Sequence, residues 1–113
     1  MDKLPEAWRK GKEIAGKYGM LYSHAIQVLA DQSLMFAFDY SFNRADEEDI
    51  DRTRRAIDES DRLTLELGGM VWRPDISAQK LMMEKMDPNT SQLIREVKRL
   101  LDPNGIMNPG NWE

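Results

Sequence analysis

Arg73 is the residue best placed to do chemistry in this sequence, because it follows Trp72 in a short segment after the pair Gly68-Gly69. A guanidinium group binds a carboxylate, phosphate or phenolate through charge-assisted hydrogen bonds, and an adjoining indole ring can pack against one side of the bound anion. An arginine in such a segment is more often a structural ion-pair partner. The residues alone make Arg73 a candidate anion clamp and leave the structural role open.

Other combinations of reactive side chains are weak. The chain has one histidine and no cysteine, which excludes thiolate chemistry and a His- or Cys-based metal cluster. His24 lies in a strand pattern, where a half-buried, hydrogen-bonded residue is a better interpretation than a catalytic base. The acids of 46–67 alternate with arginines and lack a calcium-binding loop, so they predict a solvated helix face and no metal site.

Length and charge exclude several classes of protein. The 113 residues make one domain or less, and 16 Lys+Arg against 20 Asp+Glu exclude the basic footprint of a nucleic-acid-binding protein. No apolar run approaches the roughly 18 residues of a membrane helix, and the polar start lacks a signal-peptide core. These features predict no nucleic-acid or membrane partner and a cytoplasmic location.

Hydrophobic periodicity predicts the order helix, strand, strand, long helix and helical tail. The clearest strand alternates without a break from Ser33 to Phe42. The long helix opens with acids from Asp46, and the last helix opens with the cap Asp87 before Pro88. The expected elements are a helix at 5–18, strands at 21–29 and 33–42 with a turn at 30–32, a helix at 46–67, an extended segment at 70–75, a Met-rich helix or irregular segment at 76–86, and a helix from 88 to 101.

This order predicts an α+β fold with an incomplete antiparallel sheet and helices on one face. Two strands with one strongly apolar face are marginally stable alone in water, and the sequence contains no further strand of sufficient length. Either the sheet edge pairs with a second copy of the chain, or the strands belong to a larger sheet supplied by another polypeptide.

The segment 99–110, RLLDPNGIMNPG, stops a helix and continues as ordered, non-helical chain. Pro103 lacks an N–H and disfavours helical geometry at the residue before it, while the two glycines permit a positive φ. The apolar pair Ile106-Met107 between these breakers predicts a turn pressed onto an apolar surface.

Within this segment, LDPNGIMNPG closely resembles the C-terminal signature of FAD-linked oxidases of the vanillyl-alcohol oxidase and 4-cresol dehydrogenase (methylhydroxylase) type. The element order is similar to the last part of that family's cap domain, which implies a cap portion at 1–86 and a return helix with the signature at 87–113. The Trp72-Arg73 pair past the long helix points to the phenol-oxidising branch. The glycolate oxidase and D-lactate dehydrogenase branch would show a His-Gly-Ile-Gly stretch there, which this sequence lacks.

The resemblance also implies roles for individual residues. Arg73 resembles a catalytic arginine that stabilises the phenolate and the reduced flavin, and Trp72 stands where the family has a substrate-binding tyrosine. Because an indole N–H donates but cannot ionise, a carboxylate or another aryl compound becomes an alternative to a phenol. Asn108-Pro109-Gly110 resembles the cofactor-binding segment that returns to the flavin domain, although Asn111 stands where Lys or Arg often follows.

The cofactor implied is FAD, held mainly by a missing N-terminal domain or a larger FAD-binding chain. The leading hypothesis is the C-terminal part or small subunit of a flavin-dependent oxidoreductase, inactive on its own. It would pass hydride from an aryl alcohol, alkylphenol or related hydroxylated small molecule to FAD. The alternative is a non-catalytic α+β interaction module that forms a homo-oligomer through the edge of strand 33–42. A third reading is a remnant that keeps the fold and has lost its pocket.

Overall fold

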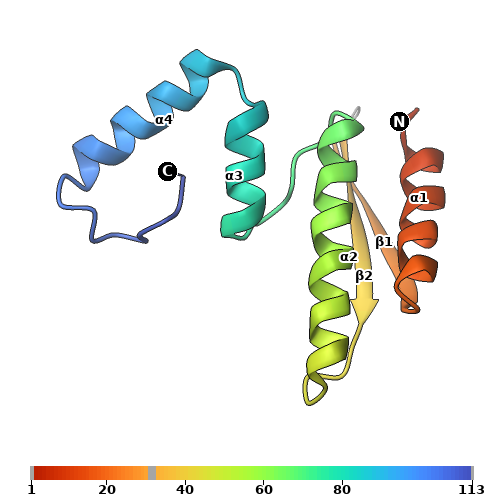
Figure 1. Cartoon of the computed structure of the whole chain (residues 1–113). Coiled ribbons are helices and arrows are strands. Elements are labelled where there is room, and N and C mark those ends of the chain that lie inside the picture. Colours follow the sequence, from red (N-terminus) through yellow and green to blue (C-terminus); the bar gives the residue numbers. More distant parts are fainter. Residues whose placement is uncertain (1, 31–32, 113) are drawn as a thin grey trace. The chain divides into compact units, whose positions relative to one another are not determined.

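A computed structural model describes residues 2–30 and 33–112 of the chain. They fall into two compact units, Met1–Gly69 and Met70–Glu113, which are described one at a time. The elements in chain order are α1 (Leu4–Lys17), β1 (Leu21–Ala30), β2 (Ser33–Ser41), α2 (Glu47–Glu66), α3 (Ile76–Lys85) and α4 (Pro88–Leu101) (Figure 1).

This order confirms the predicted α+β fold class, with α3 a regular helix where an irregular segment was the alternative. The predicted turn at 30–32 falls partly on Asp31 and Gln32, which lie outside the described residues. Across the described ranges, no helix combines the length and the apolar character needed to cross a membrane.

β1 and β2 form an antiparallel hairpin in the first unit. Tyr22 pairs with Tyr40 and His24 with Phe38. Because successive strand residues point to opposite faces, this register gathers the aromatic residues of both strands on one face. The alternation that predicted an apolar face on β2 is therefore confirmed.

Helices α1 and α2 lie beside the hairpin and cover this aromatic face (Figure 1). The buried centre consists of Ile14 from α1 with Ala56 and Leu63 from α2, and the rings of Phe38 and Tyr40 pack against it. Helices on one face of the sheet were predicted. The core of this unit is therefore a helix–helix–hairpin sandwich.

Gly11 lets α1 approach the sheet closely. A Cβ atom at this position would lie 2.6 Å from Tyr22 Oη and 2.7 Å from the Phe38 ring, closer than side chains tolerate. The Tyr22 hydroxyl below it is buried and has no hydrogen-bond partner among the described residues. Burial first, and then the neighbouring Tyr40 and Asp39, raise the pKa of Tyr22 to about 12.

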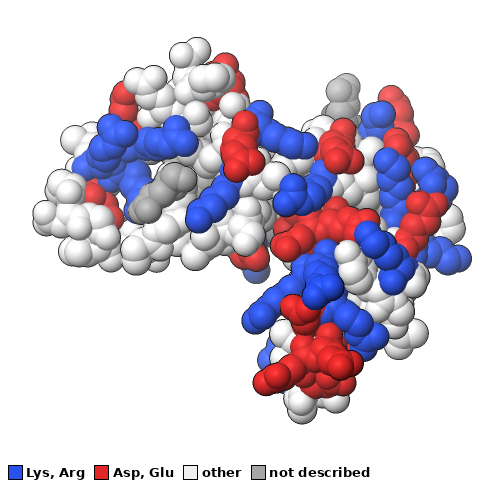
Figure 2. Space-filling view, viewed as in Figure 1, with Lys and Arg blue, Asp and Glu red and all other residues white. Residues whose placement is uncertain are grey.

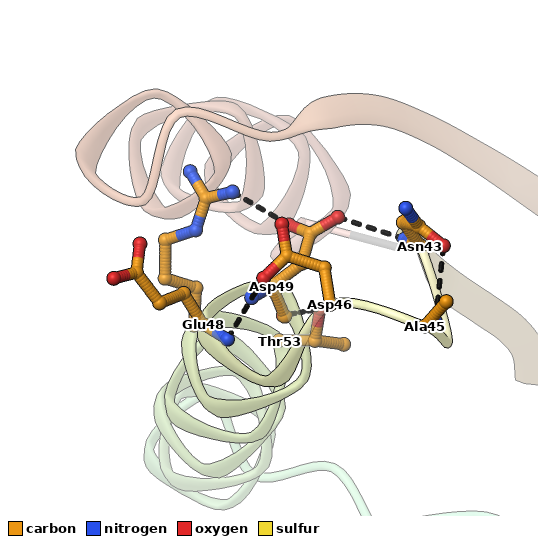
Figure 3. Close-up of polar contacts among 7 residues, drawn as sticks. Asn43, Ala45, Asp46, Glu48, Asp49 and Thr53 are labelled. Atoms are coloured by element: carbon orange, nitrogen blue, oxygen red, sulfur yellow. Dashed lines mark hydrogen bonds and ion pairs between the residues drawn. The ribbon is translucent and has the colours of Figure 1, made fainter.

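The start of α2 is fixed by acids, as the sequence predicts. The Asp46 carboxylate accepts hydrogen bonds from the backbone N–H groups of Glu48 (3.0 Å) and Asp49 (3.3 Å) (Figure 3). The Asp49 carboxylate accepts from the Asn43 N–H and from the Arg52 guanidinium, both at 2.7 Å. Acids in this first turn also suit the positive end of the helix dipole.

Acidic and basic side chains follow each other along the outer surface of α2 (Figure 2). Arg55 donates to Asp51 at 2.6 Å, one helical turn apart, with both side chains more than half exposed. This is the predicted solvated face with helical ion pairs.

Helices α1 and α2 cover only part of the aromatic face of the hairpin. Val28 is 66% exposed and Ile26 is 48% exposed, although both lie on the aromatic face. Every residue of β1 except Tyr22 is exposed, and β1 contains no Asp, Glu, Lys or Arg. The apolar face is therefore left exposed on β1 at this end of the described hairpin.

The second unit contains α3 and α4, each capped by an aspartate. Asp75 accepts from the Ala78 N–H at 2.8 Å, and Asp87 accepts from the N–H groups of Asn89 and Thr90 at 3.0 and 3.1 Å. The predicted Asp87 cap and the first-turn proline are confirmed.

The predicted apolar stripe of α4 forms but is largely uncovered in this unit. Its exposed members are Leu93, Val97, Leu100 and Leu101. The apolar pair after the helix, Ile106 and Met107, is more than half exposed as well, so the predicted apolar contact of this turn is wrong among the described residues.

Candidate functional site

Arg73 and Trp72 lie in the irregular segment before α3 and are both exposed. Arg73 has φ 56°, in the left-handed region, so the predicted extended conformation is wrong at this residue. Its guanidinium forms no hydrogen bond or ion pair with the residues that the structure describes. The ion-pair role that the sequence left open therefore has no partner within residues 2–30 and 33–112.

The C-terminal segment is shaped by Asp102, which directly follows α4. Its buried carboxylate accepts from the backbone N–H groups of Ile106 and Met107, both at 2.9 Å. Lys98, one turn back on α4, lies 3.5 Å from the same carboxylate and donates to the Met107 carbonyl at 3.0 Å. The sequence DPNGIM therefore ends α4, and the Asp102 carboxylate fixes the backbone of the turn that follows the helix.

The pKa of Asp102 reflects these contacts. Burial acts to raise it, but the two backbone N–H bonds and the nearby Lys98 ammonium together outweigh burial and hold the pKa below its usual value. The carboxylate is thus charged at neutral pH and fixes the turn.

Asn108-Pro109-Gly110 continues this turn at the surface. The Asn108 carbonyl accepts from the Asn111 N–H at 3.1 Å, and Gly110 has φ 83°. The Cβ of a residue replacing Gly110 would lie 3.9 Å from Ile76 Cδ1, at the start of α3. The predicted cofactor-binding segment therefore ends beside the helix that follows Arg73.

Gln79 of α3 joins the two predicted site segments. Its side-chain Nε2 donates to the Pro74 carbonyl at 3.1 Å and to Asn111 Oδ1 at 2.7 Å. Its Oε1 accepts from the Trp112 backbone N–H at 3.0 Å. Sequence reasoning missed Gln79, because one glutamine in a Met-rich helix carries no pattern.

Backbone strain gathers in the same two segments. The non-glycine residues with positive φ in the described chain are Arg73, Asn108 and Trp112. Such conformations cost free energy and persist where surrounding contacts enforce them, often at functional sites. Two of the three are residues that sequence reasoning selected.

A hollow of about 360 Å³ lies next to the end of α4 in this unit. It is lined by Arg95, Lys98, Arg99, Asp102, Pro103, Gly105 and Trp112. Lys and Arg side chains gather over α4 in Figure 2, around this part of the unit. Neither Arg73 nor Trp72 lines this hollow, so the predicted site is an exposed surface outside it.

His24 is exposed and lies between the rings of Tyr22 and Phe36, each 5.8 Å away. The predicted hydrogen-bonded, half-buried role is replaced by ring stacking. Over residues 2–30 and 33–112, no three His, Asp or Glu side chains gather as a metal site would need.

Residues 1–112 match the family described as FAD linked oxidases, C-terminal domain. The chain belongs to this family. The D-lactate dehydrogenase of Archaeoglobus fulgidus is 30% identical over 113 residues, which make up 96% of this chain and 24% of that protein. No solved structure matches the chain.

The chain therefore spans about a quarter of the length of this relative. Family membership implies an oxidoreductase part that works with FAD and a larger FAD-binding region. The residues of this chain fit a partial contact with that cofactor. The Arg73 guanidinium, which has no partner among the described residues, suits an anionic flavin ring, whereas the sequence has no glycine-rich cradle for a diphosphate.

Proposed function

We propose that this chain is the C-terminal part or small subunit of a flavin-dependent oxidoreductase that oxidises a hydroxylated small molecule. The single observation that carries the proposal is the family match over residues 1–112. FAD, when bound by the larger region, supplies the hydride acceptor. The chain alone is proposed to be inactive.

Arg73 is the proposed catalytic residue. Its guanidinium is exposed and unpaired among the described residues, so it is available to an anionic oxygen of the substrate. A fixed cation at that oxygen stabilises negative charge that develops as hydride leaves the adjoining carbon. Trp72, 67% exposed beside it, is proposed to wall the substrate and to donate through its indole N–H.

Asn108-Pro109-Gly110 is proposed to contact the cofactor from the chain's C-terminal turn. We also propose that residues 1–86 form the cap portion of the enzyme and that residues 87–113 form its return helix and C-terminal signature. The exposed stripe of α4 supports it, because this helix leaves an apolar side available to a larger FAD-binding region. A cytoplasmic location, predicted from the sequence, stays a prediction.

Two substrate classes are proposed for test. The Trp72-Arg73 pair favours an aryl alcohol or alkylphenol, as in the vanillyl-alcohol oxidase and 4-cresol dehydrogenase branch. The relative named D-lactate dehydrogenase favours a 2-hydroxy acid, whose carboxylate Arg73 would bind in the same way.

The rival function is an interaction module that forms a homodimer through the edge of β2. The free edges of a two-stranded sheet support it. The two functions differ in their partner, since the rival needs a second copy and the oxidoreductase needs a flavoprotein.

The deciding experiment isolates the tagged chain from its native host and records the visible spectrum of the purified assembly. We expect flavin absorbance together with a larger chain, and turnover of an aryl alcohol or of D-lactate. Arg73→Ala should lower kcat/KM roughly a hundredfold, as loss of a charge-stabilising donor does. Arg54→Ala, at an exposed arginine of α2, is the matched control and should have no effect. A colourless homodimer would contradict the oxidoreductase and favour the interaction module.

A further inference from the structure

Gln79 is a buried amide on α3 with an unusual set of partners. It is 6% exposed, and a buried amide must find hydrogen bonds inside the protein. Its Nε2 donates to Pro74 O and Asn111 Oδ1, and its Oε1 accepts from the Trp112 N–H. We call Gln79 and these three residues the Gln79 network.

The partners fix the orientation of this amide. Both groups that face Nε2 are oxygen acceptors, and the group that faces Oε1 is an N–H donor. A flipped amide would place its oxygen against two oxygens and its nitrogen against an N–H, losing all three bonds. The network is thus specific for a side chain that donates twice and accepts once.

The network connects two segments that are far apart in the sequence. Pro74 directly follows Arg73, whereas Asn111 and Trp112 directly follow Gly110. The hydrogen bonds to Asn111 and Trp112 span 32 and 33 residues. One side chain therefore ties the proposed catalytic arginine to the proposed cofactor-binding turn.

The bonded residues adjoin or include strained positions. Arg73 has φ 56° and precedes a bonded carbonyl, and Trp112 has φ 58° and donates to Gln79. Left-handed geometry at non-glycine residues needs enforcement by neighbouring contacts. The Gln79 network supplies such contacts at both ends.

We propose that Gln79 is a positioning residue of the flavin enzyme: it holds the Arg73 segment and the Asn108–Gly110 turn in one fixed arrangement. The inference rests on the proposed function. Gln79 acts through the backbone of Pro74 and Trp112, so the catalytic residue remains Arg73. Loss of the network lets the guanidinium and the turn move independently, and small misplacements of a catalytic group lower turnover strongly.

The first test uses the whole chain alone. Gln79→Leu introduces an apolar side chain of similar size and removes all three hydrogen bonds. Gln79→Glu keeps an acceptor for the Trp112 N–H but places a carboxylate oxygen against the two oxygens that Nε2 contacts. Both variants should shift the backbone NMR signals of Arg73, Asn108 and Trp112 together. Gln92→Leu is the matched control, because Gln92 is an exposed glutamine of α4 that bonds to Glu96 alone among the described residues. Unchanged Arg73 and Asn108 signals in both Gln79 variants would overturn the inference.

The second test uses the flavin-containing assembly purified through this chain, with kcat counted per bound flavin. We expect Gln79→Leu to lower kcat roughly tenfold or more with a smaller change in KM, since misplacement acts on the transition state. If it fails to assemble, Asn111→Ala, which removes one bond of the network, provides a milder variant with a smaller loss of kcat. Full kcat per flavin in the assembled variants would show a structural role alone and overturn the inference.

The two proposals fail differently. If the wild-type assembly holds no flavin, the proposed function itself is wrong. If Arg73→Ala leaves kcat/KM unchanged, the proposed catalytic role of Arg73 is wrong. If Arg73→Ala is inactive while Gln79→Leu retains full turnover, the proposed function stands and the positioning role of Gln79 is wrong.

Discussion

The two units of the chain differ in how far the apolar sides of their helices are covered. In the first unit, Ile14, Ala56 and Leu63 form an apolar centre beneath two aromatic rings of β2. In the second unit, the apolar stripe of α4 is exposed, while the polar side chains of Gln79 and Asp102 are buried.

The same forces therefore order the two units in different proportions. Apolar burial stabilises the first unit in proportion to the area removed from water. The second unit buries Ala78, Met82 and Met83 but also depends on side-chain hydrogen bonds to backbone, which contribute less each and are costly when one partner is lost. The first unit therefore supplies its own core, and the second keeps much of its apolar surface for contact elsewhere.

The largest expected contrast comes from truncating one leucine in each unit. Leu63→Ala should lower the free energy of unfolding of the first unit by about 2–5 kcal/mol, because it opens a cavity in the buried centre. Leu100→Ala should change the stability of the second unit by less than about 0.5 kcal/mol, because Leu100 is 80% exposed. Urea unfolding followed by NMR signals of each unit measures both. Equal losses at the two positions would show that both units bury apolar side chains alike.

A second contrast lies within α1. Gly11→Ala gains up to about 1 kcal/mol of helix propensity but forces overpacking against Phe38 that costs about 1–3 kcal/mol, so we expect a net loss. Gly16→Ala is the matched control, since a Cβ there meets no atom within 4 Å, and it should stabilise by up to about 1 kcal/mol. Thermal unfolding of the two variants measures the difference. A gain at Gly11 would mean that α1 lies farther from the sheet.

Loss of a helix cap should affect the second unit in a measurable but smaller way. Asp87→Ala removes the acceptor for two N–H groups at the start of α4 and should cost about 1 kcal/mol. Circular dichroism and amide exchange at Asn89 and Thr90 detect the loss. Asp87→Asn retains a capping oxygen and should restore most of the stability; a loss as large as that of alanine would exclude capping as the cause.

The smallest expected effect is local and depends on pH. The folded pKa of Asp102 lies below its unfolded value, so its contribution is fully present above the unfolded pKa of about 3.9 and is lost as the pH falls through the folded pKa. We expect the exchange rates of the Ile106 and Met107 N–H groups, relative to unstructured peptides, to rise only when the pH falls below the folded pKa of Asp102. Asp102→Asn should abolish this pH dependence. An unchanged acid profile in that variant would assign the effect to another carboxyl group.

Much of the fold could be predicted because its signals are local. Alternation from Ser33 to Phe42 predicted the strand and its inner face. The acids that begin at Asp46 and the cap Asp87 predicted two helix starts within one residue. Periodicity identifies which side of an element is apolar, but it does not identify what covers that side. The exposed stripe of α4 and the open end of the hairpin at Val28 could not be predicted for this reason.

The candidate site was predictable in part. Trp72-Arg73 and Asn108-Pro109-Gly110 were selected as separate segments, and the structure adds Gln79 as the side chain that joins them. The left-handed backbone of Arg73 was missed, because the proline after it disfavours helix and thereby favoured an extended prediction. Hydrogen bonds between residues over thirty positions apart leave no local signal in one sequence.

The unpaired edge of β1 should affect how much soluble protein a cell can make. It is a ten-residue strand without a charged Asp, Glu, Lys or Arg to deter wrong neighbours, and its outer edge is unpaired in the described chain. Copies of the chain made alone would associate edge to edge and precipitate, or be captured by chaperones and degraded. We therefore expect overproduction of this chain alone to divide it between inclusion bodies and a soluble fraction, and that soluble fraction to grow when a partner that covers the edge is supplied.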